Sequence, residues 1–67
     1  MNYFIIFYGS FTKKIYCVDE ENKDKILEGW RNNRNLEFSC LNLPSKSNSF
    51  VGIKAANISM IEVRAAN

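Results

Sequence analysis

The chain contains no histidine, and its 67 residues include only two cysteines, three glycines and one proline. Without histidine there can be no histidine general base, no His-based triad and no histidine metal ligand. Two cysteines cannot supply the four nitrogen or sulfur ligands of a structural zinc site within one chain. The glycines, Gly9, Gly29 and Gly52, are too scattered to form a phosphate-binding loop. We therefore expect no catalytic residues, no metal site, no cofactor and no enzymatic activity.

Long apolar runs and a large excess of either charge are missing as well. The longest apolar run, Tyr3–Tyr8, is far too short to cross a bilayer. Met1 is followed directly by strand-forming residues without a basic segment, so we expect no secretory signal and a cytoplasmic location. The net charge of +2 is too small to indicate nucleic-acid binding by itself. A chain of this length is expected to form a single domain over residues 1–67.

One segment, Asp19–Asn33, has the pattern of an amphipathic helix. Asp19 is placed to accept hydrogen bonds from the first-turn amides as an N-cap. Ile26, Leu27 and Trp30 fall on one face, which predicts a narrow apolar stripe with Trp30 as its largest anchor. Asparagine tolerates the left-handed backbone that ends helices. Three asparagines follow the stripe: Asn32, Asn33 and Asn35.

The remaining segments are rich in β-branched and aromatic residues, which indicates strands. The predicted strands are Tyr3–Tyr8, Thr12–Val18, Leu36–Leu43, Phe50–Ala55 and Ile58–Arg64. The order predicts an α+β fold, β-β-α-β-β-β, with a twisted antiparallel sheet of four to five strands and the helix packed on one face. A partly closed barrel with the helix at one end is the alternative.

Several local features follow from the same pattern. The first strand is expected to be central, and Gly9-Ser10 to be the turn of a hairpin. The polar stretch Pro44–Ser49 is predicted to be a loop. Gly52 indicates a bulge or a close backbone approach, and the tail, residues 65–67, is expected to fray.

The two cysteines, Cys17 and Cys40, both lie in predicted strands. One interpretation is a pair of buried thiols in a reducing compartment. The other is a single disulfide, which requires the two strands to be neighbours and the compartment to be oxidising.

The nine aromatic residues exceed what so small a core can bury, so several should be exposed. Exposed aromatic side chains that form a patch indicate a protein interface. Tyr3, Tyr8 and Phe11 lie near the first hairpin and are the candidate binding surface, with Lys13 and Lys14 at its rim. The second candidate is the end of the helix, with Arg31 and Arg34.

Two alternatives concern the same aromatic residues. A homodimer, formed sheet on sheet or edge to edge, could cover the face of the first strand that points away from the helix. Otherwise the rings pack under the Pro44–Ser49 loop and the last strand.

Nucleic-acid binding or transcriptional regulation is the alternative function. Basic residues and aromatic rings together could hold a strand and stack its bases. However, the cations are spread along the chain, and the pairs Lys13-Lys14 and Arg31/Arg34 are next to a turn and a helix end, where solvated charge is usual.

The stretches VDEENKDKILEGW and FVGIKAANISMIEV give the chain a layout that resembles small proteins of phages, prophages and other mobile elements. In these proteins a strand hairpin precedes an acid-capped helix and a closing pair of strands. The resemblance implies a protein that works by stoichiometric binding, such as an anti-CRISPR protein or another inhibitor of a host defence system. The implied partner is a host protein or ribonucleoprotein complex in the host cytoplasm.

Overall fold

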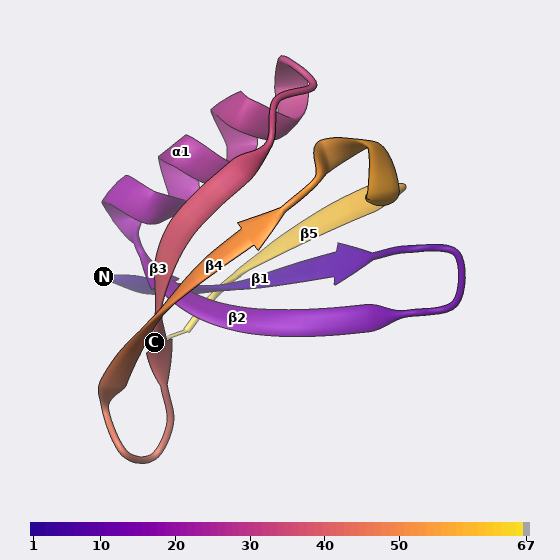
Figure 1. The fold of residues 1–67 in the computed structure, drawn as a ribbon. Helices are drawn as coiled ribbons and strands as arrows, with labels where there is room; N and C mark the ends of the chain where they lie inside the picture. Colours follow the sequence, from indigo (N-terminus) through magenta and orange to yellow (C-terminus); the bar gives the residue numbers. More distant parts are fainter. Residues whose placement is uncertain (67) are drawn as a thin grey trace.

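The computed structural model describes residues 1–66 and contains one five-stranded antiparallel sheet and one helix (Figure 1). The strand order is β4-β3-β2-β1-β5, so β1 is paired on both sides and β4 and β5 are the edges. The predicted α+β fold is confirmed. The elements are β1 (Asn2–Tyr8), β2 (Lys13–Asp19), α1 (Glu20–Arg31), β3 (Leu36–Asn42), β4 (Ser47–Ile53), the 3₁₀ turn η1 (Ala55–Asn57) and β5 (Met60–Ala65).

Helix α1 begins and ends where the sequence indicates. The Asp19 carboxylate accepts hydrogen bonds from the backbone and side-chain amides of Asn22, both at 2.8 Å. At the other end, Asn33 has a φ of 55°, and the Arg34 amide donates to the Gly29 carbonyl at 2.8 Å. The predicted N-cap and the asparagine stop are both confirmed, since each satisfies backbone groups that a helix end leaves without partners.

The helix covers one face of the sheet, which we call the inner face and which carries Ile5, Phe7 and Val18. Ile26 is the residue of α1 that enters the core, and it is 1% exposed. Trp30 is half-buried and packs against the rim of the same core. The core therefore centres on Ile26 rather than on the indole. Its buried members are Ile5, Phe7, Val18, Ile26, Leu36, Phe38 and Cys40.

The sheet is nearly divided between β2 and β3. In the described part of the chain these strands are paired only at Cys17 and Leu41, and Figure 1 shows β3 and β4 running across the direction of β1 and β2. Where the pairing stops, the side chain of Asn22 on α1 accepts a hydrogen bond from the Ser39 amide at 3.2 Å. The helix thus replaces part of the missing pairing. The order of the strands leaves two edges, so the sheet is not a closed barrel.

The prediction of a loop over Pro44–Ser49 is wrong for its second half, Ser47–Ser49, which forms the start of β4. The turn ends at Lys46, which has a φ of 62°, and β4 begins at Ser47. Asn42 donates hydrogen bonds to the hydroxyls of Ser47 and Ser49 at 3.3 and 2.7 Å. A strand can therefore be formed by polar residues here because the side chains bond across it and face water.

Two other predictions near the C-terminus also need correction. Gly52 lies opposite Glu37 in an unbroken register, and a Cβ atom there would lie 4.0 Å from the Leu36 carbonyl oxygen, so there is neither a bulge nor a close backbone approach. Ala65 belongs to β5, and the Ala66 amide donates to the Asn2 carbonyl at 3.0 Å, so neither residue frays in the way expected. The prediction for Asn67 concerns a residue outside the described part of the chain.

The two cysteines are buried free thiols. Cys17 pairs with Leu41, the residue after Cys40, so neighbouring strands carry the two thiols on opposite faces of the sheet. A disulfide requires the two Cβ vectors to point toward each other. The interpretation as two buried thiols is confirmed, and the disulfide is excluded by side-chain direction.

Gly29 has a packing role that its helix propensity does not show. A Cβ atom at this position would lie 2.7 Å from Cδ2 of Leu36, which is 2% exposed. Alanine should raise helix propensity by about 1 kcal/mol, but overpacking against a buried leucine costs about 1–3 kcal/mol. We therefore expect Gly29→Ala to lower the free energy of unfolding by roughly 1 kcal/mol, as measured by urea denaturation. Glu28→Ala, on the exposed part of the same helix, is the matched control, and a gain in stability for Gly29→Ala would contradict the proposed contact.

The helix cap should also make stability depend on pH. The Asn22 backbone amide, followed by its side-chain amide, holds the pKa of Asp19 below its ordinary value. Because the pKa of Asp19 is lower in the folded protein, ionised Asp19 stabilises the fold at pH values above its ordinary pKa of about 4. This contribution to stability is lost as the pH falls through the lowered pKa. Asp19→Ala should cost about 1 kcal/mol at neutral pH. Asp19→Asn should keep the cap and lose this part of the pH dependence, as followed by denaturation at several pH values; an unchanged acid profile would refute the assignment.

Candidate functional site

The face of the sheet opposite the helix, the outer face, has apolar side chains on β1 and β2, and no helix formed by residues 1–66 covers it. Ile6 and Ile15 lie opposite each other on β1 and β2, as do Phe4 and Cys17. Ile15 is 55% exposed and Leu43 is 56% exposed. A shallow pocket of about 240 Å³ lies between Ile15 and Leu43, and its lining includes Phe4 and Leu41. We call the apolar residues of this lining that lie on the outer face the outer patch, in which Cys17 is buried: Phe4, Ile15, Cys17, Leu41 and Leu43.

A larger groove lies on the inner side, between the β1–β2 hairpin and β4. It has a volume of about 550 Å³ and an aromatic floor that includes Phe7 and Tyr16. These two rings are 5.7 Å apart in an edge-to-face arrangement. The side chains of Val51 and Ile53 of β4 form the opposite wall, and Lys14 is the one charged side chain that residues 1–66 contribute to the lining. The groove can therefore accept apolar groups and a negative charge near its rim.

The structure separates the aromatic residues that the sequence suggested as one patch. Tyr3 and Tyr8 are near opposite ends of β1 and, since their positions differ by an odd number, point to opposite faces. The Tyr3 hydroxyl donates to Glu20 at 3.1 Å, and the Tyr8 hydroxyl donates to Glu62 at 2.9 Å. Both phenols therefore have partners within the chain.

The other residues of that predicted surface lie around the β1–β2 hairpin. Phe11 is fully exposed at the turn, as the sequence indicated. Lys13 lies opposite Tyr8, with its ammonium 5.9 Å from the centre of the ring. Lys14 lies opposite Phe7 and faces the groove. The hairpin thus brings Tyr8 and Lys13 together on the outer face, while Lys14 belongs to the inner face.

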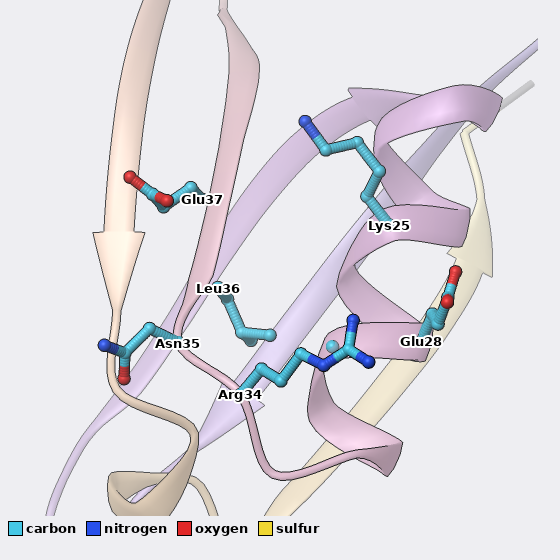
Figure 2. A pocket seen from close by; sticks show the side chains of 7 residues that line it. Lys25, Glu28, Arg34, Asn35, Leu36 and Glu37 are labelled. Atoms are coloured by element: carbon cyan, nitrogen blue, oxygen red, sulfur yellow. The ribbon is translucent and has the colours of Figure 1, made fainter.

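The second predicted surface, at the end of the helix, is a shallow polar pocket of about 270 Å³. Figure 2 shows Arg34 extending toward α1 near Leu36, with Glu28 on the facing part of the helix and Lys25 farther along it. Glu37 completes the charged part of the lining, so two cations are balanced by two carboxylates. Such a balance does not favour a phosphate. Arg31 is exposed in the last turn of α1 and is not part of this lining.

A charged network borders the outer patch on β5. Glu62 accepts from Tyr8 and forms an ion pair with Arg64 at 2.6 Å. The Arg64 guanidinium and then the Tyr8 hydroxyl lower the pKa of Glu62, and the bond to Glu62 raises the pKa of Tyr8. In the same way, the bond to Glu20 raises the pKa of Tyr3.

The sequence contained a signal for the outer patch that the search for aromatic residues missed. Ile15–Val18 is an unbroken apolar run, and such a run places apolar side chains on both faces of a strand. Leu41 and Leu43 add a second pair on one face of the next strand. The one helix of residues 1–66 covers the inner face, and on the outer face Ile15 and Leu43 stay exposed although Ile6 and Cys17 are buried.

Neither a metal centre nor a membrane span is found in residues 1–66. In this part of the chain, no three metal-binding side chains of histidine, cysteine, aspartate or glutamate come together. Among the same residues, no helix has the length and apolar composition needed to cross a bilayer. Comparison with protein-family models, with curated proteins and with solved structures gives no match for this chain.

The bond between Tyr8 and Glu62 can be tested by titration. Glu62→Ala removes both the acceptor and the negative charge that oppose ionisation of the phenol, so the pKa of Tyr8 should fall toward its ordinary value. Ring carbon chemical shifts of the tyrosines measured against pH would show this change. Glu20→Ala is the matched control and should lower the pKa of Tyr3 while leaving Tyr8 unchanged. A Tyr8 titration unaffected by Glu62→Ala would show that the bond does not form in solution.

Proposed function

We propose that the protein is a non-enzymatic module that binds another protein by surface contact. The observation that carries this proposal is the outer patch, whose exposed Ile15 and Leu43 flank the half-buried Phe4 and Leu41. Contiguous apolar surface is costly to leave in water and is typical of protein interfaces. The patch is bordered on β5 by Glu62 and Arg64, and an apolar centre with a polar rim is the usual anatomy of such interfaces.

The placement of charge gives less support to nucleic-acid binding, the alternative function. Strand-binding surfaces need cations that follow a phosphate backbone. In the described part of the chain, two cations are instead paired with neighbouring carboxylates, Lys23 with Asp24 at 2.9 Å and Arg64 with Glu62, and no row of cations is formed there. A salt titration with a labelled single strand tests this alternative, because true binding weakens steeply as salt is added.

The biological setting of the proposal comes from the sequence pattern alone. If the resemblance to mobile-element proteins reflects origin, the partner is a component of a host defence system such as CRISPR–Cas, and binding inhibits it. A protein that occupies a surface on its target needs exposed contacts and no catalytic group. The outer patch meets that requirement.

The experiment compares capture of proteins from a host lysate by three forms of the chain. The double variant Ile15→Thr, Leu43→Gln makes the outer patch polar while keeping a β-branched residue in β2. Phe11→Ser, at a fully exposed position outside the patch, is the matched control. We expect a protein that the wild type and the control retain and that the double variant loses, because the loss of apolar contact at the centre of an interface costs about 1–3 kcal/mol.

Three outcomes would contradict the proposal. The first is an identical set of captured proteins for all three forms. The second is recovery of nucleic acid alone. The third is a dimer in light scattering that the double variant converts to a monomer, because a second copy would then cover the patch.

A further inference from the structure

The outer edge of β4 has no partner in the described part of the chain. β4 pairs with β3 alone, and no backbone hydrogen bond outside the strand ladders involves residues 47–53. Five of its seven residues are exposed, and Phe50 at its centre is 69% exposed. An unpaired strand edge offers a row of N–H and C=O groups to any extended segment.

The usual protection of an edge strand is missing from β4. Proteins block such edges with charged residues, prolines or bulges. β4 has none of these within Ser47–Ile53, and its register with β3 is unbroken. The other edge strand, β5, has the ion pair between Glu62 and Arg64 within it. The two edges therefore differ, and β4 is the one open to pairing.

The groove on the inner side gives an added strand a place for its side chains. Val51 and Ile53 of β4 have their side chains on the inner face and form one wall of the groove, and Tyr16 lies across from them. A strand paired with β4 would direct every second side chain toward this groove. Those side chains should be apolar, because the part of the lining that the structure describes is mostly apolar or aromatic and has Lys14 as its one charged group.

The charges at the two ends of β4 decide against a second copy of this chain. Lys46 and Lys54 lie immediately before and after the strand, each four positions from Phe50. Antiparallel self-pairing centred on Phe50 would place each Lys46 opposite a Lys54, and parallel in-register pairing would also bring identical lysines together. Like charges directly opposite each other destabilise a strand pair. Neither lysine forms an ion pair within the described chain.

We infer that β4 binds an extended segment of another protein, which adds a sixth strand to the sheet. The segment has apolar side chains at alternate positions, directed into the groove, and a carboxylate at each end to pair with Lys46 and Lys54. Backbone hydrogen bonds provide affinity in this mode, and side-chain pockets and end charges provide specificity. This site is separate from the outer patch, so the two proposals stand or fall independently.

The test uses capped peptides that reach from Lys46 to Lys54 and alternate valine with threonine. One peptide has glutamate at both ends, and the matched peptide has lysine. Binding is followed by backbone amide shifts. We expect the glutamate-ended peptide to shift the amides of β4 and to bind about tenfold tighter than the lysine-ended peptide, with the difference shrinking as salt is added.

Two controls identify backbone pairing and the role of the end charges. Two versions of the glutamate-ended peptide are N-methylated, one at the odd and one at the even positions. Only the version whose methyl groups lie on the edge that faces β4 should lose binding, because only that edge donates hydrogen bonds to β4. The variant Lys46→Glu, Lys54→Glu should reverse the preference between the two peptides. Lys25→Glu, an exposed change on α1 away from the groove and β4, should leave it unchanged.

The inference fails if neither peptide shifts the β4 amides at concentrations up to about 1 mM, or if both N-methylated versions act alike. It also fails if a single-stranded oligonucleotide binds this edge more tightly than the glutamate-ended peptide. Loss of peptide binding together with normal capture through the outer patch would remove this inference and leave the proposed function in place. Normal peptide binding together with loss of the specific capture through the outer patch would remove the proposed function and leave this inference in place.

Discussion

The close approach of α1 to β3 is the constraint on which the rest of the structure depends. Gly29 has no side chain, and this lets Leu36 lie against the helix backbone. Leu36 is the first residue of β3, so this contact fixes where the second half of the sheet begins. The hydrogen bond from the Ser39 amide to Asn22 then holds the same strand beside the first turns of the helix. The helix is therefore both the cover of the core and the link between the two halves of the sheet.

This position of the helix accounts for the two exposed surfaces of the sheet, the groove beside β4 on the inner face and the uncovered outer face. β2 and β3 pair at one position, Cys17 with Leu41, and diverge from there, while α1 contacts β3 through Asn22 and Ser39. The divergence leaves a groove between the hairpin and β4 on the inner side. It also leaves the outer face without cover, since the described chain has no second helix. Both candidate binding surfaces thus result from a single helix that supports only one face.

The two surfaces suit different kinds of contact. The outer patch is formed by side chains and has a polar border, which suits a folded partner with a complementary face. The edge of β4 is formed by backbone groups, which suits an extended segment. The chain thus combines a sealed inner core with two exposed surfaces, and we propose that these surfaces perform its function.

The sequence by itself determined the elements, because their signals are local. Asp19 and the asparagines mark the helix ends, and the alternation of Leu36, Phe38 and Cys40 marks the buried face of β3. The tertiary structure decided the properties that depend on residues far apart in the chain. The fold places Tyr3 and Tyr8 on opposite faces, with their hydroxyls donating to Glu20 and Glu62. It also brings residues of β1, β2 and β3 together in the outer patch. It also made Ser47–Ser49 a strand, because cross-strand bonds to Asn42 outweigh the weak strand propensity of serine and asparagine.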